Sequence, residues 1–261
     1  MTTFERRQRL MILLREQPGI RVPEVAELLG VSEGTIRNDL NSLAGLGQVR
    51  RVRGGGVLLD ELQDRSPIFA TRVMTHRSAK LAITQQAASL VKDNDSVMLD
   101  SSTTSYYLAC CLKESRDLTV ITNGIESARE LAKNPSNTVI LPGGVLRVDG
   151  TATSMPMGEQ FLGDYHIKTA FVSCSGFTPE GGLTEVDIFE AQIKRRMIAS
   201  SGSTVALIDA SKFGRMDLTV FARTDQITHL FTDCSLSPEW VKKLKKAGLP
   251  FTLCGSTLEA E

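Results

Sequence analysis

Apolar residues recur every three or four positions along the first part of the chain, which is the spacing of a helix with one buried face. Three such segments are present: one over Phe4–Glu16, one that Gly30 would end, and one that carries Ile36 and Leu40. Ser32 stands before the third segment, where its hydroxyl can cap the helix. We therefore predict three short helices near the start of the chain.

The pattern changes after Gly47, where valines and arginines are interleaved before three glycines and an apolar run that closes at Leu59. This arrangement is typical of two strands, and the glycines permit a tight turn between them. The segment therefore predicts a thin β-hairpin with three arginines on it, directly after the third helix.

The outer face of the third predicted helix has residue types that can recognise DNA bases. Gly34 and Asn38 lie at the centre of that face, and no acidic residue does. Asparagine can form two hydrogen bonds with adenine and arginine with guanine, while arginines on a hairpin can contact phosphates or the minor groove. Any helical hairpin with a polar outer face has a partly similar appearance, and here the basic hairpin favours DNA binding. The predicted DNA contacts are Ser32, Thr35, Arg37, Asn38, Asn41, Arg50, Arg51 and Arg53.

From His76 onward, an Ala-rich helical segment is followed by short apolar runs that alternate with further helical segments. Runs of this length, rich in Val, Ile and Leu and separated by helices, indicate a parallel sheet covered on both faces. We therefore expect an α/β chain in which a DNA-binding domain precedes a Rossmann-like parallel-sheet domain. The runs are Ser96–Leu99, Leu118–Ile121, Thr138–Leu141, Thr169–Val172, Thr204–Ile208, His229–Thr232 and Pro250–Leu253.

The predicted domain boundaries follow from these changes of pattern. Residues 1–59 form the DNA-binding domain and residues 76–261 form the sheet domain. Residues 60–75 have weak periodicity and one proline, so we interpret them as a linker. The alternative for this segment is an extra short helix or strand packed on the second domain.

Polar loops follow five of the predicted strands, and in a parallel sheet such loops lie along one edge. The first loop opens directly into a helix, where free backbone N–H groups and four consecutive hydroxyls favour an anion such as phosphate. Lys212 can balance its charge, as can Arg147 or Lys80 if the fold brings them near, while Asp100 and Asp209 can accept hydrogen bonds from sugar hydroxyls. The loops predict a pocket for a phosphorylated polyol. The alternative is that strand–helix turns are polar simply because they cap helices.

A further helical segment follows the glycine turn at Gly181. Glu190 and Lys194 are spaced i, i+4 on it, which predicts a surface salt bridge. The alternative places Glu190 or Asp187 at the mouth of the pocket.

Composition narrows the function. The 261 residues are 41% apolar and have a formal net charge of zero, so the basic character is local to the hairpin rather than spread over the chain. The five cysteines are odd in number and form no CxxC pair, which predicts reduced thiols and no metal site or cofactor. Cys174 is interpreted as a buried small residue, with a place at the pocket border as the alternative. No secretory signal and no stretch of about 20 apolar residues is present, so we expect a cytoplasmic protein without a membrane span.

The first segment resembles the winged helix-turn-helix of the DeoR family of bacterial regulators. Asn38 is a departure, because the family commonly has Arg there, so the operator sequence is not carried over. The likeness rests on Val31-Ser32, Thr35-Ile36-Arg37, Asp39-Leu40, Leu43, Gly47, Arg50-Arg51-Val52 and Gly54-Gly55.

The second part of the chain is similar to the sensor domain of the same family, and the matching pieces come in the family's order. They are DSSTT at 100–104, TNG at 122–124, LPGG with Arg147, SCSG at 173–176, GGLTE at 181–185, Glu190 with Lys194, and DASKFG at 209–214. Ser102 stands where many relatives have Gly, which can alter how closely a phosphate approaches the backbone.

The resemblance implies a fold related to ribose-5-phosphate isomerase and control of transcription, usually repression, by a phosphorylated sugar. It also implies contacts from the Ser/Thr loop, Lys80, Asp209 and Lys212. We expect a homodimer or homotetramer on double-stranded operator DNA. The predicted effector contacts are Lys80, Asp100, Ser101, Ser102, Thr103, Thr104, Asn123, Gly143, Gly144, Arg147, Ser175, Gly176, Glu190, Asp209 and Lys212.

The alternative from a different class is a sugar-phosphate isomerase with a DNA-binding appendage. Such an enzyme needs a positioned carboxylate base. The related isomerases have paired aspartates where this chain has Ser173-Cys174-Ser175-Gly176. We therefore predict no catalytic residues and a regulator rather than an enzyme.

Overall fold

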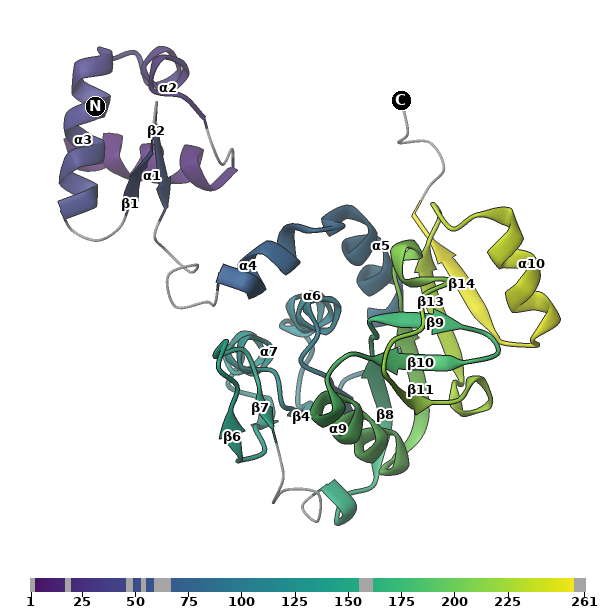
Figure 1. Ribbon diagram of the computed structural model, residues 1–261. Helices are drawn as coiled ribbons and strands as arrows, with labels where there is room; N and C mark the ends of the chain where they lie inside the picture. The colour runs from purple at the N-terminus through teal and green to yellow at the C-terminus, as the bar shows by residue number, and fades with distance from the viewer. Residues whose placement is uncertain are drawn as a thin grey trace. The chain divides into compact units, whose positions relative to one another are not determined.

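The computed structural model describes residues 3–16, 20–45, 49–52, 55–58, 67–154 and 162–255 (Figure 1). The chain divides into two compact units, Met1–Pro67 and Ile68–Glu261. Each unit has its own apolar core.

The first unit contains the predicted three helices and hairpin. Helix α2 ends at Gly30, whose φ of 64° is left-handed, and the Ser32 hydroxyl accepts the Thr35 N–H at 3.1 Å as the cap of α3. Leu10 of α1 packs with Ile36 of α3 in a common core. The elements are α1 (Thr3–Glu16), α2 (Val22–Leu29), α3 (Glu33–Gly45) and the antiparallel pair β1 (Val49–Val52) and β2 (Gly55–Leu58).

The second unit is built on a seven-stranded sheet in which every neighbouring pair is parallel. All seven predicted apolar runs are strands of this sheet, with small shifts at their ends, so the α/β fold class is confirmed. The strands, from one edge to the other, are β14 (Phe251–Cys254), β13 (His229–Asp233), β11 (Ser201–Leu207), β8 (Ile167–Val172), β3 (Ser96–Leu99), β4 (Thr119–Thr122) and β5 (Thr138–Ile140).

The strand order creates a switch point between β3 and β8. From β3 the chain adds β4 and β5 on one side, and then returns to place β8, β11, β13 and β14 on the other. In open α/β sheets, the crevice at such a reversal is the usual ligand position, because the loops on its two sides diverge there.

Helices cover both faces of the sheet, as the long apolar runs predict. Val97 and Leu99 of β3 pack with α5, α6 and α7, while Met98 between them packs with α9. Helix α10 covers the same face as α9 further along the sheet, where its Leu244 packs near Leu230 of β13. The helices are α5 (Arg77–Ala88), α6 (Thr103–Leu112), α7 (Ile125–Leu131), α9 (Ile188–Ala199) and α10 (Pro238–Lys246).

Two small antiparallel sheets, which the sequence did not predict, accompany the main sheet. One is ordered β12 (Thr219–Ala222), β10 (Gly182–Glu185), β9 (Gly176–Thr178), and the other pairs β6 (Val145–Leu146) with β7 (Thr153–Ser154). Gly182 has a φ of 75°, and a Cβ there would lie 2.1 Å from the Ala222 carbonyl oxygen. Only glycine therefore allows β10 to approach β12 so closely.

The segment that we interpret as a linker is a helix over part of its length. Helix α4 (Pro67–Met74) packs Phe69 and Val73 against Tyr106 and Tyr107 of α6. The Tyr107 hydroxyl donates to the Val73 carbonyl oxygen at 3.1 Å. The alternative of a short helix packed on the second domain therefore describes residues 67–74, while 60–66 lie outside the described residues. Among the described helices, none is long and apolar enough to span a bilayer.

Candidate functional site

A cavity of about 130 Å³ lies at the carboxyl ends of β3, β8 and β11, and so spans the switch point between β3 and β8. Three of the five predicted polar loops contribute to it, together with α4, the turn that follows it and α5. Its volume is below the ~300–1,000 Å³ of sites for drug-sized ligands, so it suits a small ligand. The lining residues are Arg72, Thr75, His76, Lys80, Ser102, Thr103, Thr104, Ser173, Cys174, Ser175, Glu185, Asp209 and Lys212.

The start of α6 supplies two unused hydroxyls to this cavity. The Ser102 hydroxyl is already engaged, because it accepts the Ser105 N–H at 3.1 Å as the helix cap. The capping alternative therefore holds for Ser102. Thr103 and Thr104 line the cavity, and their hydroxyls make no hydrogen bond within the described part of the chain. With the free N–H groups of the first helical turn, they form a place for an anion.

Cationic groups face the same place. The Lys80 ammonium is buried and donates to the carbonyl oxygens of Arg72 and Thr75, at 2.5 and 2.7 Å. Burial lowers the pKa of Lys80 to about 8, with Asp209 opposing and Lys212 and Arg72 adding to the shift. The Lys212 ammonium has no hydrogen-bond or ion-pair partner among the described residues. The cavity can therefore attract and hold an anion at this end.

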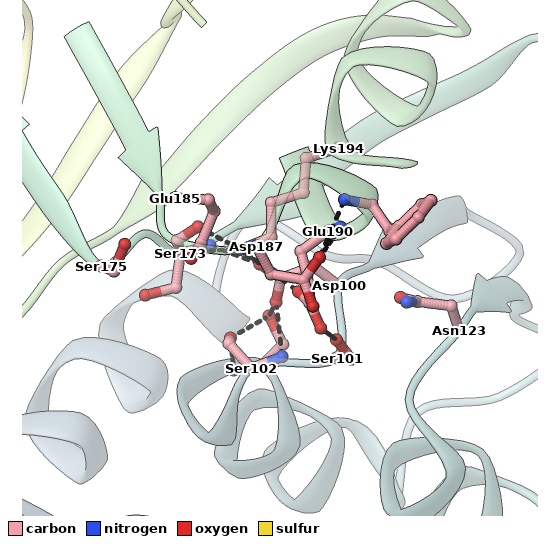
Figure 2. Close-up of polar contacts among 12 residues, drawn as sticks. Asp100, Ser101, Ser102, Asn123, Ser173, Ser175, Glu185, Asp187, Glu190 and Lys194 are labelled. Atoms are coloured by element: carbon pink, nitrogen blue, oxygen red, sulfur yellow. Dashed lines mark hydrogen bonds and ion pairs between the residues drawn. The ribbon is translucent and has the colours of Figure 1, made fainter. Parts of the chain in front are cut away.

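Asp100 is buried and connects two of the loops that line the cavity (Figure 2). Its carboxylate accepts the backbone N–H groups of Ser102 at 3.1 Å and Ser173 at 2.8 Å, and the Lys194 ammonium lies 3.1 Å away. Burial favours the neutral acid, but the charge of Lys194 and these hydrogen bonds hold the pKa of Asp100 below its usual value. Asp100 is fully buried and does not line the cavity, so it braces the site instead of reaching a sugar as we expected.

The prediction of a Glu190–Lys194 surface pair was wrong. Lys194 is 2% exposed, its ammonium lies 2.5 Å from Glu185, and Glu190 is at 3.9 Å. Lys194 shares the buried face of α9 with Ala191 and Ile198, at helical spacing. The i, i+4 rule identifies neighbours on a helix but not the face on which they lie.

Glu190 and Arg147 form an ion pair with each other. Glu190 accepts hydrogen bonds from the Arg147 guanidinium and, at 2.9 Å, from the Ser101 hydroxyl. Arg147 also lies within ion-pair distance of Asp187 and Asp149. Arg147 is therefore balanced by carboxylates and does not supply the free positive charge that we considered for it.

The loops after β4 and β5 do not line the cavity. Asn123 is buried and donates to the Thr153 carbonyl oxygen at 3.3 Å, while Gly143 and Gly144 are exposed in the loop after β5. Gly176 belongs to β9, where a Cβ would lie 2.6 Å from a backbone oxygen. The predicted effector residues that line the cavity are Lys80, Ser102, Thr103, Thr104, Ser175, Asp209 and Lys212; those that do not are Asp100, Ser101, Asn123, Gly143, Gly144, Arg147, Gly176 and Glu190.

Besides Cys174, the predicted contacts lack five lining residues: Arg72, Thr75, His76, Glu185, and Ser173 of the SCSG loop. The first three lie in or beside the segment that we interpreted as a linker. The only sign of a helix there is the apolar pair Phe69 and Val73, which packs α4. Glu185 ends the glycine-led GGLTE segment, which gave no sign of its direction. Cys174 satisfies both interpretations, because it is buried and lines the cavity. Among the described residues, no cluster of His, Cys, Asp or Glu could hold a metal ion.

The presumed DNA-reading face of α3 is open to solvent. Ser32, Asn38 and Asn41 are exposed, and Thr35 is half-buried. Arg37 pairs with Glu33 at 2.7 Å, but both side chains are largely exposed, so the pair stabilises by under about 1 kcal/mol and can be exchanged for a base contact. Arg50 and Arg51 lie on β1, and Arg53 lies outside the described residues.

Asp39, on the opposite face of α3, fastens α1 to it. Its buried carboxylate accepts hydrogen bonds from Arg6 at 2.5 Å and Arg7 at 2.9 Å. We expect Asp39→Ala to destabilise the first unit by about 1–3 kcal/mol, because two guanidinium groups lose their acceptor. Hydrogen exchange of the α1 and α3 amides should accelerate, with the second unit unchanged. Glu33→Ala, which breaks an exposed pair, is the matched control; equal protection in both variants would contradict the role of Asp39.

Comparison with known proteins agrees with this organisation. Residues 6–61 match the family model described as a DeoR-like helix-turn-helix domain, and residues 75–234 match the DeoR C terminal sensor domain. The chain belongs to the DeoR family. It is a DNA-binding transcriptional regulator, and the isomerase alternative is not supported.

Named relatives of this DeoR-family chain align over most of its length. The HTH-type transcriptional regulator GolR of Listeria innocua is 37% identical over 96% of this chain and 98% of its own. The L-fucose operon activator of Haemophilus influenzae is 34% identical over 85% of this chain and 89% of its own. Among solved structures, ribose 5-phosphate isomerase A from Methanocaldococcus jannaschii overlaps 52% of this chain and 54% of its own, with 16% identity and a TM-score of 0.39.

Proposed function

We propose that this regulator controls a sugar-metabolism operon and that a small phosphorylated sugar in the cavity releases it from DNA. The observation that carries the proposal is the meeting of Lys80 and Lys212 with the unused Thr103 and Thr104 hydroxyls at the start of α6. Ammonium groups and the N–H groups at a helix start can bind a phosphate, and the other polar residues of the cavity can form hydrogen bonds with the hydroxyls of a sugar. The Haemophilus relative is named for an L-fucose operon, which is in keeping with a sugar.

The cavity wall suggests how binding reaches the DNA-binding unit. Arg72 lies on α4 and Thr75 in the turn after it, and the chain runs from the first unit through 59–66 directly into α4. Lys80 holds the carbonyl oxygens of both residues. An anion competes for this ammonium and loosens the carboxyl end of α4, the first described helix after the DNA-binding unit.

DNA recognition then depends on two copies of the chain. Two α3 helices of a homodimer or homotetramer read half-sites about 34 Å apart, one helical turn of DNA. The family resemblance favours repression, although the Haemophilus relative is named an activator. Light scattering measures the oligomeric state. A reporter gene placed behind the bound site shows whether the protein represses or activates transcription.

The test is a DNA-release titration. A site selected from random duplexes by the full chain is labelled, and its affinity is measured by fluorescence anisotropy with a panel of hexose and pentose monophosphates. We expect at least one monophosphate to weaken binding about 5- to 150-fold, the usual range of allosteric coupling, while its unphosphorylated sugar does not. Equal effects of the neutral sugar, or no effect of any monophosphate, would reject the proposal.

Ligand affinity should fall as pH rises through about 8, because Lys80 loses its proton there. A phosphate monoester titrates near pH 6, so it remains a dianion and adds no slope of its own. Above pH 8 most Lys80 side chains are neutral and must take up a proton before the ligand can bind. The dissociation constant should therefore rise up to tenfold per pH unit above 8. Calorimetry from pH 7 to 9.5 measures it. Lys80→Met should bind more weakly at pH 7 with a flat profile, and an unchanged slope in that variant would exclude Lys80 as the titrating group.

A further inference from the structure

Glu185 brings a carboxylate into the cavity from β10, a strand that carries none of the cationic residues that line the cavity. The cationic lining residues Arg72, Lys80 and Lys212 lie on α4, on α5 and in the loop after β11. Glu185 is instead paired with Lys194, on the side where β10 ends. The cavity therefore has a cationic part, formed by Lys80 and Lys212, and a carboxylate at Glu185 whose counter-ion is Lys194.

The Glu185 carboxylate is held firmly by one oxygen. Its Oε1 accepts a hydrogen bond from the Lys194 ammonium at 2.5 Å (Figure 2). Lys194 is itself immobilised, because it is buried and also donates to the Ser173 carbonyl oxygen at 2.8 Å. The backbone of Glu185 is fixed as well, since β10 is the central strand of its sheet and pairs Glu185 with Thr219.

The second oxygen, Oε2, accepts no hydrogen bond from any residue that the structure describes, although the side chain lines the cavity. A carboxylate accepts hydrogen bonds and donates none. It can therefore receive a ligand hydroxyl, whereas a second phosphate or a carboxylate placed there would meet a like charge.

We propose that Glu185 determines the ligand class of this cavity: it accepts a hydroxyl of a sugar monophosphate and rejects ligands with a second anionic group. This inference rests on the proposed function, because it assumes that the phosphate occupies the cationic part. Asp209, the other lining carboxylate, also has one oxygen engaged, by the Ser211 N–H at 3.1 Å and the Ser211 hydroxyl, but it belongs to the loop that carries Lys212. Glu185 would then act in two ways: it attracts a ligand hydroxyl, and it repels a second anionic group.

The experiment compares the full-length wild type with Glu185→Gln, which keeps the side-chain shape and an oxygen for Lys194. Calorimetry measures binding of inorganic phosphate, of the panel of hexose and pentose monophosphates, and of fructose 1,6-bisphosphate. Hydrogen bonds to charged groups are worth about ten- to hundredfold in affinity. We expect Glu185→Gln to lose about that factor for the monophosphate that the wild type prefers, to keep its phosphate affinity, and to bind the bisphosphate relatively better.

Control variants separate the outcomes. Glu180→Gln makes the same change of charge at an exposed position on the same segment, and should bind all probes as the wild type does. Glu185→Asp keeps the charge beside Lys194 but withdraws the accepting oxygen, so it serves if the Gln variant does not fold; it should lose monophosphate affinity without gaining bisphosphate.

The inference is overturned if Glu185→Gln leaves monophosphate affinity unchanged, or weakens inorganic phosphate equally, which would indicate a structural role. If the wild type binds neither phosphate nor any monophosphate, the proposed function fails first. If it binds phosphate but prefers no monophosphate over it, the proposed anion site stands and the inference about Glu185 fails.

Discussion

Replacing Lys194 by methionine is expected to destabilise the second unit by about 3–5 kcal/mol, the usual cost of leaving buried charge without its partner. The side chain is 2% exposed, and its removal leaves the carboxylates of Asp100 and Glu185 uncompensated. It also releases the Ser173 carbonyl oxygen. Urea unfolding followed by fluorescence measures the loss, because Trp240 is the only tryptophan of the chain and packs on Phe213 in this unit.

Lys168→Met is the matched control, since its ion pair with Asp95 is at the surface and contributes about 1 kcal/mol or less. The pH dependence gives a second check. The folded state holds the pKa of Asp100 low, so ionised Asp100 stabilises the folded state. This stabilisation is fully present above the unfolded pKa of about 3.9 and is lost as pH falls through the folded pKa. Lys194→Met should move this acid transition to higher pH. Equal, small losses in both lysine variants would mean that Lys194 is not needed to balance Asp100.

The seven strands of the main sheet could be predicted because buried parallel strands are short, apolar and separated by helices. Ser96–Leu99, for example, begins and ends where its apolar run does. The strands β9, β10 and β12 could not be predicted in this way. They are short, and the fit of β10 depends on a backbone approach at Gly182, which is a property of the folded neighbours and not of a local pattern.

Only part of the site could be predicted, because the sheet edge is longer than a small ligand. Carboxyl ends of parallel strands do share one edge, but neighbouring strands are about 4.8 Å apart. The loops after β11 and β5 are therefore about 19 Å apart, since four strand spacings separate them. A small ligand can contact the loops after β3, β8 and β11, which are adjacent, but not all five. Strand order cannot be read from apolar runs, so Asn123 and Gly143 were grouped with Thr103 and Lys212.

The division between bracing and binding residues also depended on burial. Asp100 and Asp209 both follow strands, and the sequence treats them alike. In the structure Asp100 is buried behind the cavity lining and accepts hydrogen bonds from backbone N–H groups, whereas Asp209 lines the cavity. Polar residues at strand ends thus mark the site, while the folded neighbours determine which of them a ligand can reach.

Lys212→Met is expected to abolish release from DNA while leaving DNA affinity unchanged, a change from about 5- to 150-fold release to none. The Lys212 ammonium has no partner among the described residues, so its removal leaves no group uncompensated and should not unfold the protein. It does remove a positive charge from the part of the cavity that Lys80, Thr103 and Thr104 line. Fluorescence anisotropy with and without the preferred monophosphate measures the effect.

Lys245→Met, at an exposed position on α10, is the control for loss of one positive charge and should respond to the ligand as the wild type does. The two variants separate a local role from the overall charge of the second unit, which can also alter DNA affinity. If Lys212→Met weakens DNA binding in the absence of ligand, Lys212 has a structural role. If release persists at wild-type ligand concentrations, the phosphate is bound elsewhere and the cavity at β3, β8 and β11 is not the effector site.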